Sequence, residues 1–234
     1  MSDSFGAVAT SDSLPPSPPA RVHGAWSAQA ERRLLEALAC RAPAFLTADQ
    51  LTALGFLAQL GAGAAYAASP RHPGALWLAS GCVVLNWLGD SLDGTLARVR
   101  NQQRPRYGFY VDHMVDVLGM TALLGGMALS GYMHAATAAA VLTAFLLLAS
   151  ESFLAASALG RFQLSQGPFG PTELRLLLLG GNLALLRSPW ATVWGHRWLL
   201  FDLGGTVAAA SMGIMVLLVT ARHTAELYRR EPLR

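Results

Sequence analysis

Charged side chains are scarce in this sequence. Asp, Glu, Lys and Arg make up 13% of the 234 residues, whereas they make up about 25% of an ordinary soluble domain. Lysine is absent altogether, so arginine supplies all 17 basic side chains. Hydrophobic residues account for 53% of the chain. This composition argues against an ordinary soluble domain and indicates an integral membrane protein.

Cysteine is nearly absent, and runs of basic residues are missing. Cys40 and Cys82 lie far apart, without the spacing of metal ligands, and we expect both to be small buried hydrophobic residues. Nucleic-acid binding favours a basic stretch interleaved with aromatic side chains, which the sequence does not contain. These absences argue against a cysteine-based metal site and against a nucleic-acid partner.

The first 24 residues are rich in Ser, Pro and Gly and lack the apolar run of a signal peptide, so we predict a disordered tail over 1–24. Residues 25–42 are predicted to form a helix that places Trp26, Leu34, Leu35 and Leu38 near one face. A short amphipathic helix that carries arginine and tryptophan is typical of one lying in the membrane interface. The alternative is a short soluble cap.

Apolar segments dominate the rest of the chain. Each is near the roughly 20 residues that a bilayer core requires, and membrane-spanning backbone of this kind must be helical. We predict six spans, separated by proline and glycine breakers, at about 47–68, 74–98, 108–132, 135–160, 172–188 and 203–222. The fold class is therefore an all-α integral membrane protein with an N-terminal interfacial amphipathic helix. The six-helix domain covers 43–228, and a cytoplasmic tail follows over 229–234.

Arginine is distributed unevenly across these predicted spans. With six spans, only Arg71, Arg187 and Arg197 fall on one side of the membrane, and the other fourteen arginines fall on the side of both termini. Positive residues concentrate on the cytoplasmic side. We therefore predict a multi-pass protein of a bacterial cytoplasmic (inner) membrane, with both termini and the connection between the second and third spans in the cytoplasm.

Four aspartates occupy the facing ends of the second and third predicted spans. Asp90 and Asp93 are three residues apart, and Asp112 and Asp116 are four apart, so each pair shares a helical face. Charged side chains within membrane helices are costly and mark functional sites by default. The bland alternative is that they cap helices or line water.

Carboxylates this close together repel one another unless a cation lies between them. Hard oxygen ligands select Mg²⁺, Mn²⁺ or Ca²⁺, and four of them suit a pair of metal ions that bridge phosphate oxygens. We therefore predict two divalent cations, Mg²⁺ or Mn²⁺, and a substrate that carries a diphosphate. A divalent-cation transporter with the same ligands is the alternative from another functional class.

The spacing of these acids resembles a known signature. Asp-x2-Asp-Gly-x2-Ala-Arg at 90–98, nine further residues, and Gly-x3-Asp-x3-Asp at 108–116 match the CDP-alcohol phosphotransferase family at all eight fixed positions. The resemblance implies a homodimer that takes a CDP-alcohol donor and an acceptor alcohol among membrane lipids. It implies metal ligation by Asp90, Asp93 and Asp112, with Asp116 as further ligand and general base. The residues that it places around the CDP group are Gly94, Ala97, Arg98 and Gly108.

A weaker resemblance concerns the start of the first span. Residues 48–55 are similar to a family pattern in which Pro and Asn stand where this chain has Ala48 and Asp49. It implies that Asp49 and Thr52 touch the nucleotide. The alternative is that they are a helix N-cap and a packing residue.

The choice of alcohols rests on fewer residues. Asp112-His113-x-x-Asp116 resembles choline and ethanolamine phosphotransferases, in which the histidine is a candidate base or relay beside Asp116. Glu173 and Arg175 resemble the fifth helix of the same branch, and Glu151 is a further intramembrane acid; we assign all three to the acceptor or headgroup. Helix-dipole, ion-pair or interhelical hydrogen-bond roles are the alternatives for the two glutamates. We favour CDP-choline or CDP-ethanolamine with diacylglycerol or ceramide. The alternative is CDP-diacylglycerol with inositol phosphate, serine or glycerol phosphate.

Overall fold

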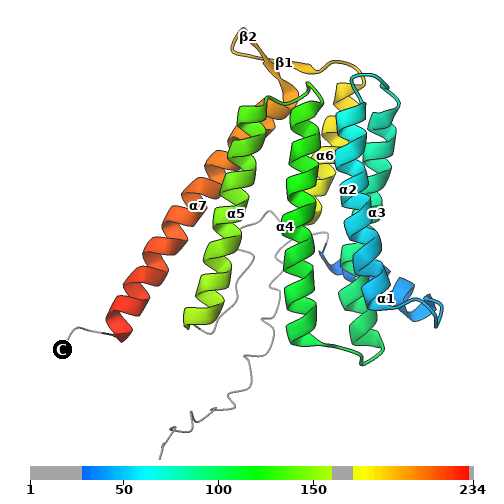
Figure 1. Ribbon diagram of the computed structural model, residues 1–234, viewed down its shortest axis with the longest axis vertical. Helices are drawn as coiled ribbons and strands as arrows, with labels where there is room; N and C mark the ends of the chain where they lie inside the picture. The colour runs from blue at the N-terminus through cyan, green and yellow to red at the C-terminus, as the bar shows by residue number, and fades with distance from the viewer. Residues whose placement is uncertain (1–27, 160–170, 232–234) are drawn as a thin grey trace, which may run out of the picture.

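The computed structural model describes residues 28–159 and 171–231 as a bundle of helices with one small hairpin. Figure 1 shows the long helices side by side, with the hairpin at one end. The predicted tail 1–24, residues 25–27 of the predicted interfacial helix and the last residues of the tail at 229–234 lie outside the described residues. The elements are α1 Ala28–Arg41, α2 Ala48–Ala68, α3 Ala75–Val99, α4 Pro105–Leu129, α5 Ala135–Leu159, α6 Pro171–Leu185, β1 Trp190–Val193, β2 His196–Leu199 and α7 Leu200–Arg230.

Four helices are long and apolar enough to cross a membrane, namely α2, α3, α5 and α7. The 25-residue α4 contains Asp112, His113 and Asp116, which lower its hydropathy. The described α6 has 15 residues, about 22 Å at 1.5 Å per residue, against a hydrocarbon core of about 30 Å. A multi-pass membrane protein therefore fits the structure, while the count of six spans stays a prediction.

Helix α2 lies against both α3 and α4 through glycines. A Cβ atom added to Gly126 of α4 would come 1.9 Å from the carbonyl oxygen of Gly63 in α2. On the other side of α2, a Cβ at Gly89 of α3 would lie 2.7 Å from the Cα of Gly55. Small residues let membrane helices approach this closely, with van der Waals packing in place of a hydrophobic driving force. These contacts bring the walls of the site described below close together.

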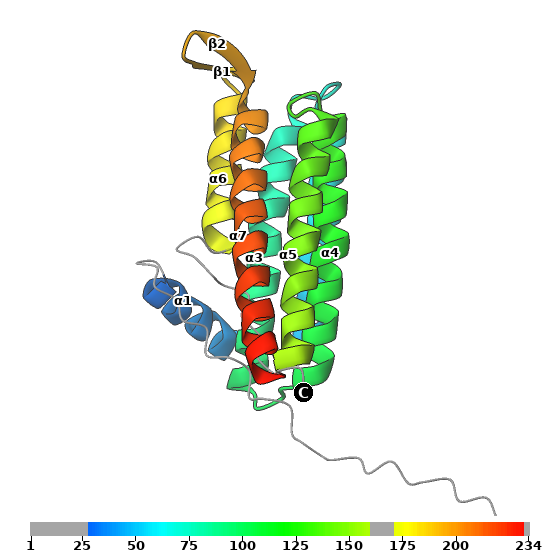
Figure 2. The ribbon, with the colours of Figure 1, turned by 90° about the vertical axis from the view of Figure 1, so that its left-hand side faces the viewer.

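Helix α1 lies at a steep angle to the bundle near one end (Figure 2). Leu35 and Ala39 are buried in a cluster with Leu51, Leu92 and Leu96. Leu34, which the sequence placed on the same apolar face, is 50% exposed. Leu35 and Ala39 therefore dock α1 on the bundle, while Leu34 lies at the surface. The interfacial position of this helix stays a prediction.

The two cysteines differ in their surroundings. Cys82 is half-buried and packs against the main core cluster, as a small hydrophobic residue should. Cys40 is exposed, so the expectation that it is buried was wrong. It lies on α1 next to buried Ala39, and consecutive helical positions point about 100° apart.

The hairpin between α6 and α7 corrects the purely helical prediction. Strands β1 and β2 pair antiparallel, with Trp190 opposite Leu199 and Val193 opposite His196. The two turn residues, Trp194 and Gly195, both have positive φ, at 51° and 80°, as a type I′ turn requires. Helix α7 then begins at Leu200 and runs to Arg230, beyond the predicted 203–222.

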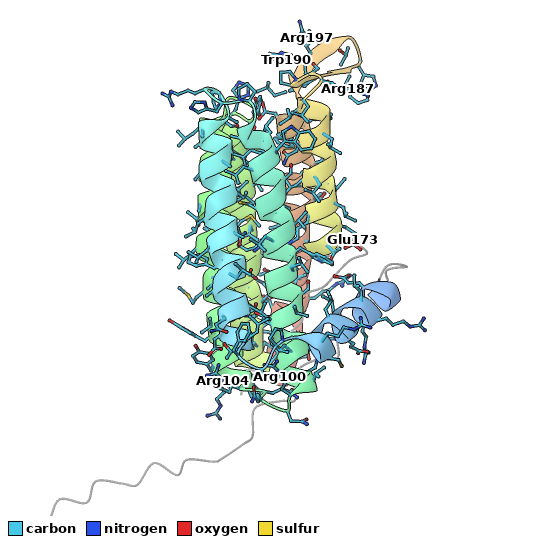
Figure 3. All side chains as sticks on the ribbon, turned by 90° about the vertical axis from the view of Figure 1, so that its right-hand side faces the viewer. Arg100, Arg104, Glu173, Arg187, Trp190 and Arg197 are labelled. Carbon is cyan, nitrogen blue, oxygen red and sulfur yellow. The ribbon has the colours of Figure 1, made fainter. Side chains whose placement is uncertain are left out.

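The arginines labelled in Figure 3 lie at two ends of the bundle. Arg187 and Arg197 accompany the hairpin, while Arg100 and Arg104 lie at the opposite end, between α3 and α4. This grouping agrees with the predicted division of arginines between two sides. Which side faces the cytoplasm stays a prediction.

Candidate active site

The structure brings the four aspartates of the predicted signature to one pocket. Asp90 and Asp93 enter it from α3, and Asp112 and Asp116 enter it from α4. Both helices carry their acids on the face turned to α2, which supplies a further wall of the pocket. The remaining lining residues are Thr52, Gly55, Phe56, Gln59, Asn86 and Val115.

Asp90 is held from α6. The Nη2 atom of Arg175 donates to its Oδ2 at 2.6 Å, and the Nε of the same guanidinium donates to Oδ1 of Asn86 at 3.1 Å. Asn86 in turn donates from Nδ2 to the backbone oxygen of Gly55 at 3.0 Å. Sequence reasoning missed Asn86. The signal was present, because Asn86 precedes Asp90 by one helical turn and so shares its face.

Asp93 is held from α2. The hydroxyl of Thr52 donates to its Oδ2 at 2.5 Å and also lies 3.1 Å from the carbonyl oxygen of Ala48. Thr52 therefore contacts a signature acid and is more than a packing residue. Its neighbour Asp49 is not the N-cap of α2, because Thr47 and Gln50 form a capping box there.

Asp49 points instead to the connection between α3 and α4, where it forms an ion pair with Arg104. A second, larger and more open pocket at that place is lined by Thr47, Ala48, Asp49, Gln102, Gln103 and Arg104. It lies at the end of the bundle that carries the labelled Arg100 and Arg104 (Figure 3). The structure thus separates Asp49 from the acid pocket while leaving Thr52 in it.

The small residues of the signature leave open surface near the acids. A Cβ at Gly108 would meet nothing within 4 Å, and one at Gly94 would meet only the guanidinium of Arg98, at 3.8 Å. Arg98 is exposed and donates to the hydroxyl of Thr95 at 3.0 Å. Ala97 is half-buried. These four signature residues do not line the acid pocket itself, and they lie on the neighbouring turns of α3 and α4.

His113 lies next to Asp112 without entering the acid pocket. Its Nδ1 lies 2.6 Å from the carbonyl oxygen of Phe109, and its ring packs against Phe109 and, from α5, Phe153. The side chain is 13% exposed and does not line the acid pocket, although Nδ1 is 4.0 Å from Oδ2 of Asp112. The structure therefore places His113 beside the site, against an aromatic wall.

The two glutamates outside the signature lie apart from the acid pocket. Glu151 of α5 accepts from Nδ1 of His223 in α7 at 2.6 Å, which is the interhelical hydrogen bond weighed as the alternative for it. Sequence reasoning missed His223 as its partner, since 72 residues separate the two. Glu173 lies in the first turn of α6, at the end nearest α1 (Figure 3).

The chemistry of the lining fits a hard divalent cation, because four carboxylates from two helices surround one pocket. Their positions do not form a closed ligand set. Within residues 28–159 and 171–231, no three His, Cys, Asp or Glu side chains converge on a point that could hold a metal ion. Asp90 and Asp93 are directed to Arg175 and Thr52 instead.

Comparison with known families agrees with this arrangement. Residues 45–222 match the model of a family described as CDP-alcohol phosphatidyltransferase. The match covers more than half of the chain and includes the whole 90–116 signature. Searches of curated proteins and of solved structures found no match.

Proposed function

This chain belongs to the CDP-alcohol phosphatidyltransferase family, and we propose that it transfers phosphocholine or phosphoethanolamine from the CDP-linked donor to diacylglycerol or ceramide. The family supports the coarser statement that a phospho-alcohol group is transferred from a CDP-alcohol to an acceptor alcohol. The observation that carries the proposal is that Asp90, Asp93, Asp112 and Asp116 all line one pocket.

In the proposed reaction the acceptor hydroxyl attacks the β-phosphorus of the donor. The bond from that phosphorus to the bridging oxygen breaks, and CMP leaves with the bonding electron pair. Asp116 accepts the hydroxyl proton as general base. It lines the pocket one turn beyond Asp112 on α4, and we prefer it to His113, whose Nδ1 is engaged by the carbonyl oxygen of Phe109.

The four acids would hold two divalent cations, Mg²⁺ or Mn²⁺, which when bound neutralise the charge that develops on the diphosphate. The chain's own contribution is to orient the carboxylates. Thr52 fixes Asp93 from α2, and Arg175 with Asn86 fixes Asp90 from α6 and α3.

The choice of an amino alcohol has two supports. One is that Asp112-His113-x-x-Asp116 resembles the motif of choline and ethanolamine phosphotransferases. The other is that this chain has His113 and Val117 at two positions where the branch that makes phosphatidylglycerophosphate typically has Pro and Lys. The alternative, CDP-diacylglycerol with inositol phosphate, serine or glycerol phosphate, would use the same acids.

The test is a donor screen on the purified protein. CDP-choline, CDP-ethanolamine and CDP-diacylglycerol are each supplied with diacylglycerol, ceramide or a small polar alcohol, and CMP is measured. We expect CMP release that depends on Mg²⁺ or Mn²⁺ and is fastest with an amino-alcohol donor. CMP from CDP-diacylglycerol alone would select the alternative branch. Cation uptake into vesicles without CMP from any donor would select a transporter.

A further inference from the structure

The side chain of Arg175 contacts the acid pocket through Asp90 but does not line the pocket itself. Its side chain is 16% exposed, and the Asp90 side chain that it contacts is 30% exposed. The contact joins α6 to α3 across 85 residues of sequence, with 2.6 Å between Nη2 and Oδ2. A charge-assisted hydrogen bond of this length is among the stronger contacts that two side chains make.

The guanidinium is oriented by a second contact. Its Nε donates to Oδ1 of Asn86, and Asn86 is itself held by donating to the carbonyl oxygen of Gly55 and, at 3.4 Å, to Gln59. Asn86 is buried, with 9% of its surface exposed. Buried Asn86, which is held by α2, therefore orients the guanidinium of Arg175 toward Asp90. The packing of the helices thus supports this ion pair.

Arg175 and a divalent cation would both bind the carboxylate of Asp90. Under the proposed function, Asp90 is a ligand of a divalent cation, which requires lone pairs of its carboxylate. Arg175 already occupies Oδ2 of Asp90. The two cations therefore compete, and whichever binds first raises the free-energy cost of the other by mutual repulsion.

From this geometry we propose that Arg175 is a positioning residue that holds Asp90 in competition with a divalent cation and so sets the metal affinity of the site. The inference deepens the proposed function and rests on its assignment of Asp90 as a ligand. It changes the role of Arg175 from acceptor or headgroup binding to control of a signature carboxylate.

The experiment titrates Mn²⁺ into the purified protein, without nucleotide, and follows the electron paramagnetic resonance signal of the free ion. Replacing Arg175 by Gln removes the competing charge, and we expect the apparent affinity for Mn²⁺ to tighten about tenfold. Arg175→Lys, which keeps the charge but loses the guanidinium that contacts both Asp90 and Asn86, should give an intermediate affinity. Arg187→Gln is the matched control, because it removes one arginine at the far end of the bundle (Figure 3).

A double-mutant cycle isolates the pair. Asp90→Asn should weaken Mn²⁺ binding, and adding Arg175→Gln to that variant should change the affinity by less than about twofold, because the competition requires both side chains. Thermal unfolding gives a second readout. Arg175→Gln should lower the melting temperature in a chelator and recover in saturating Mn²⁺, whereas a purely structural arginine would lower it equally in both.

Three results would overturn the inference. The first is an Mn²⁺ affinity in Arg175→Gln that is unchanged or weaker, and the second is an equal effect of this substitution in the Asp90→Asn background. A wild-type protein that binds no Mn²⁺ would also overturn it. The proposed function fails separately, if no CDP-alcohol yields CMP. In that case a tightened Mn²⁺ affinity in Arg175→Gln would still establish the competition.

Discussion

Two groups of polar side chains connect α2, α3 and α6, and they differ in charge and burial. At the end away from the acids, the hydroxyl of Tyr66 donates to Oδ1 of Asn182 at 2.7 Å, and Nδ2 of Asn182 donates to Ser80 at 3.0 Å. Tyr66 and Asn182 are 0% and 1% exposed. Nearer the signature, Arg175, Asn86 and Asp90 connect the same α3 and α6, but they carry charge and border a pocket.

The difference shows which polar contacts serve the fold and which serve the site. A buried neutral network with every partner in place fixes how helices pack. Partly exposed carboxylates gathered at one pocket repel one another and oppose packing, so a functional role explains them better. Variants in the first group should therefore change stability and leave turnover per folded molecule unchanged, whereas variants in the second should change metal binding or turnover.

The largest expected effect is on turnover, when one of the four pocket aspartates is replaced. Asp116→Asn keeps the size of the side chain and removes its basicity. We expect kcat at saturating metal to fall about 100- to 10,000-fold, the contribution of a positioned general base. CMP release measures it, and Mn²⁺ binding measured on the same sample separates loss of the base from loss of a ligand.

Asp202→Asn is the matched control for that substitution. Asp202 is a buried aspartate at the start of α7 and accepts from the backbone nitrogen of His134 at 2.8 Å, far from the pocket in sequence and fold. Its replacement should lower the melting temperature and leave turnover per folded molecule unchanged. Near-normal turnover of Asp116→Asn with intact metal binding would reject Asp116 as the base.

The contact between Gly63 and Gly126 lies on α2 between the two polar groups and should affect both. An added Cβ in Gly126→Ala would stand 1.9 Å from the oxygen of Gly63, so α4 must move away from α2. We expect a loss of about 1–3 kcal/mol of stability from overpacking. Turnover should fall about tenfold or more, because small displacements of catalytic groups are costly.

The adjacent glycine supplies the control. A Cβ at Gly125 would meet nothing within 4 Å, so Gly125→Ala should be neutral or stabilising by up to about 1 kcal/mol, the helix propensity gain. Melting temperature in detergent and CMP release are measured for both variants. Equal behaviour of the two alanine variants would contradict the packing of α2 against α4.

The acids were predictable from the sequence because their signal is local. The spacing of Asp90 and Asp93, and of Asp112 and Asp116, places each pair on one helical face. Charged residues within an apolar segment are also easy to recognise. The contact of Arg175 with Asp90 was not predictable, because it depends on how α6 packs against α3. The spacing of Arg175 within its own helix carries no sign of its partner.

The hairpin and the packing partner of His113 were also not predictable from the local sequence. The turn of the hairpin is Trp194-Gly195 in place of the usual Asn-Gly, and the positive φ of Trp194 is a tertiary outcome. His113 follows Asp112 directly, so its helical direction could be predicted about 100° away. That it packs against Phe153 of α5 could not, because the neighbour on that side is set by the arrangement of the bundle.

The smallest expected effect is on stability, in the neutral group. Asn182→Ala removes the acceptor of the Tyr66 hydroxyl and the donor to Ser80. We expect a loss of about 1–2 kcal/mol, since hydrogen bonds between membrane helices contribute modestly, with kcat per folded molecule unchanged. Leu183→Ala, at a position 55% exposed, is the control and should shift the melting temperature much less. If Asn182→Ala instead reduced turnover at an unchanged melting temperature, the division between a structural and a functional polar group would fail, because the effect would have to reach the acids through α3.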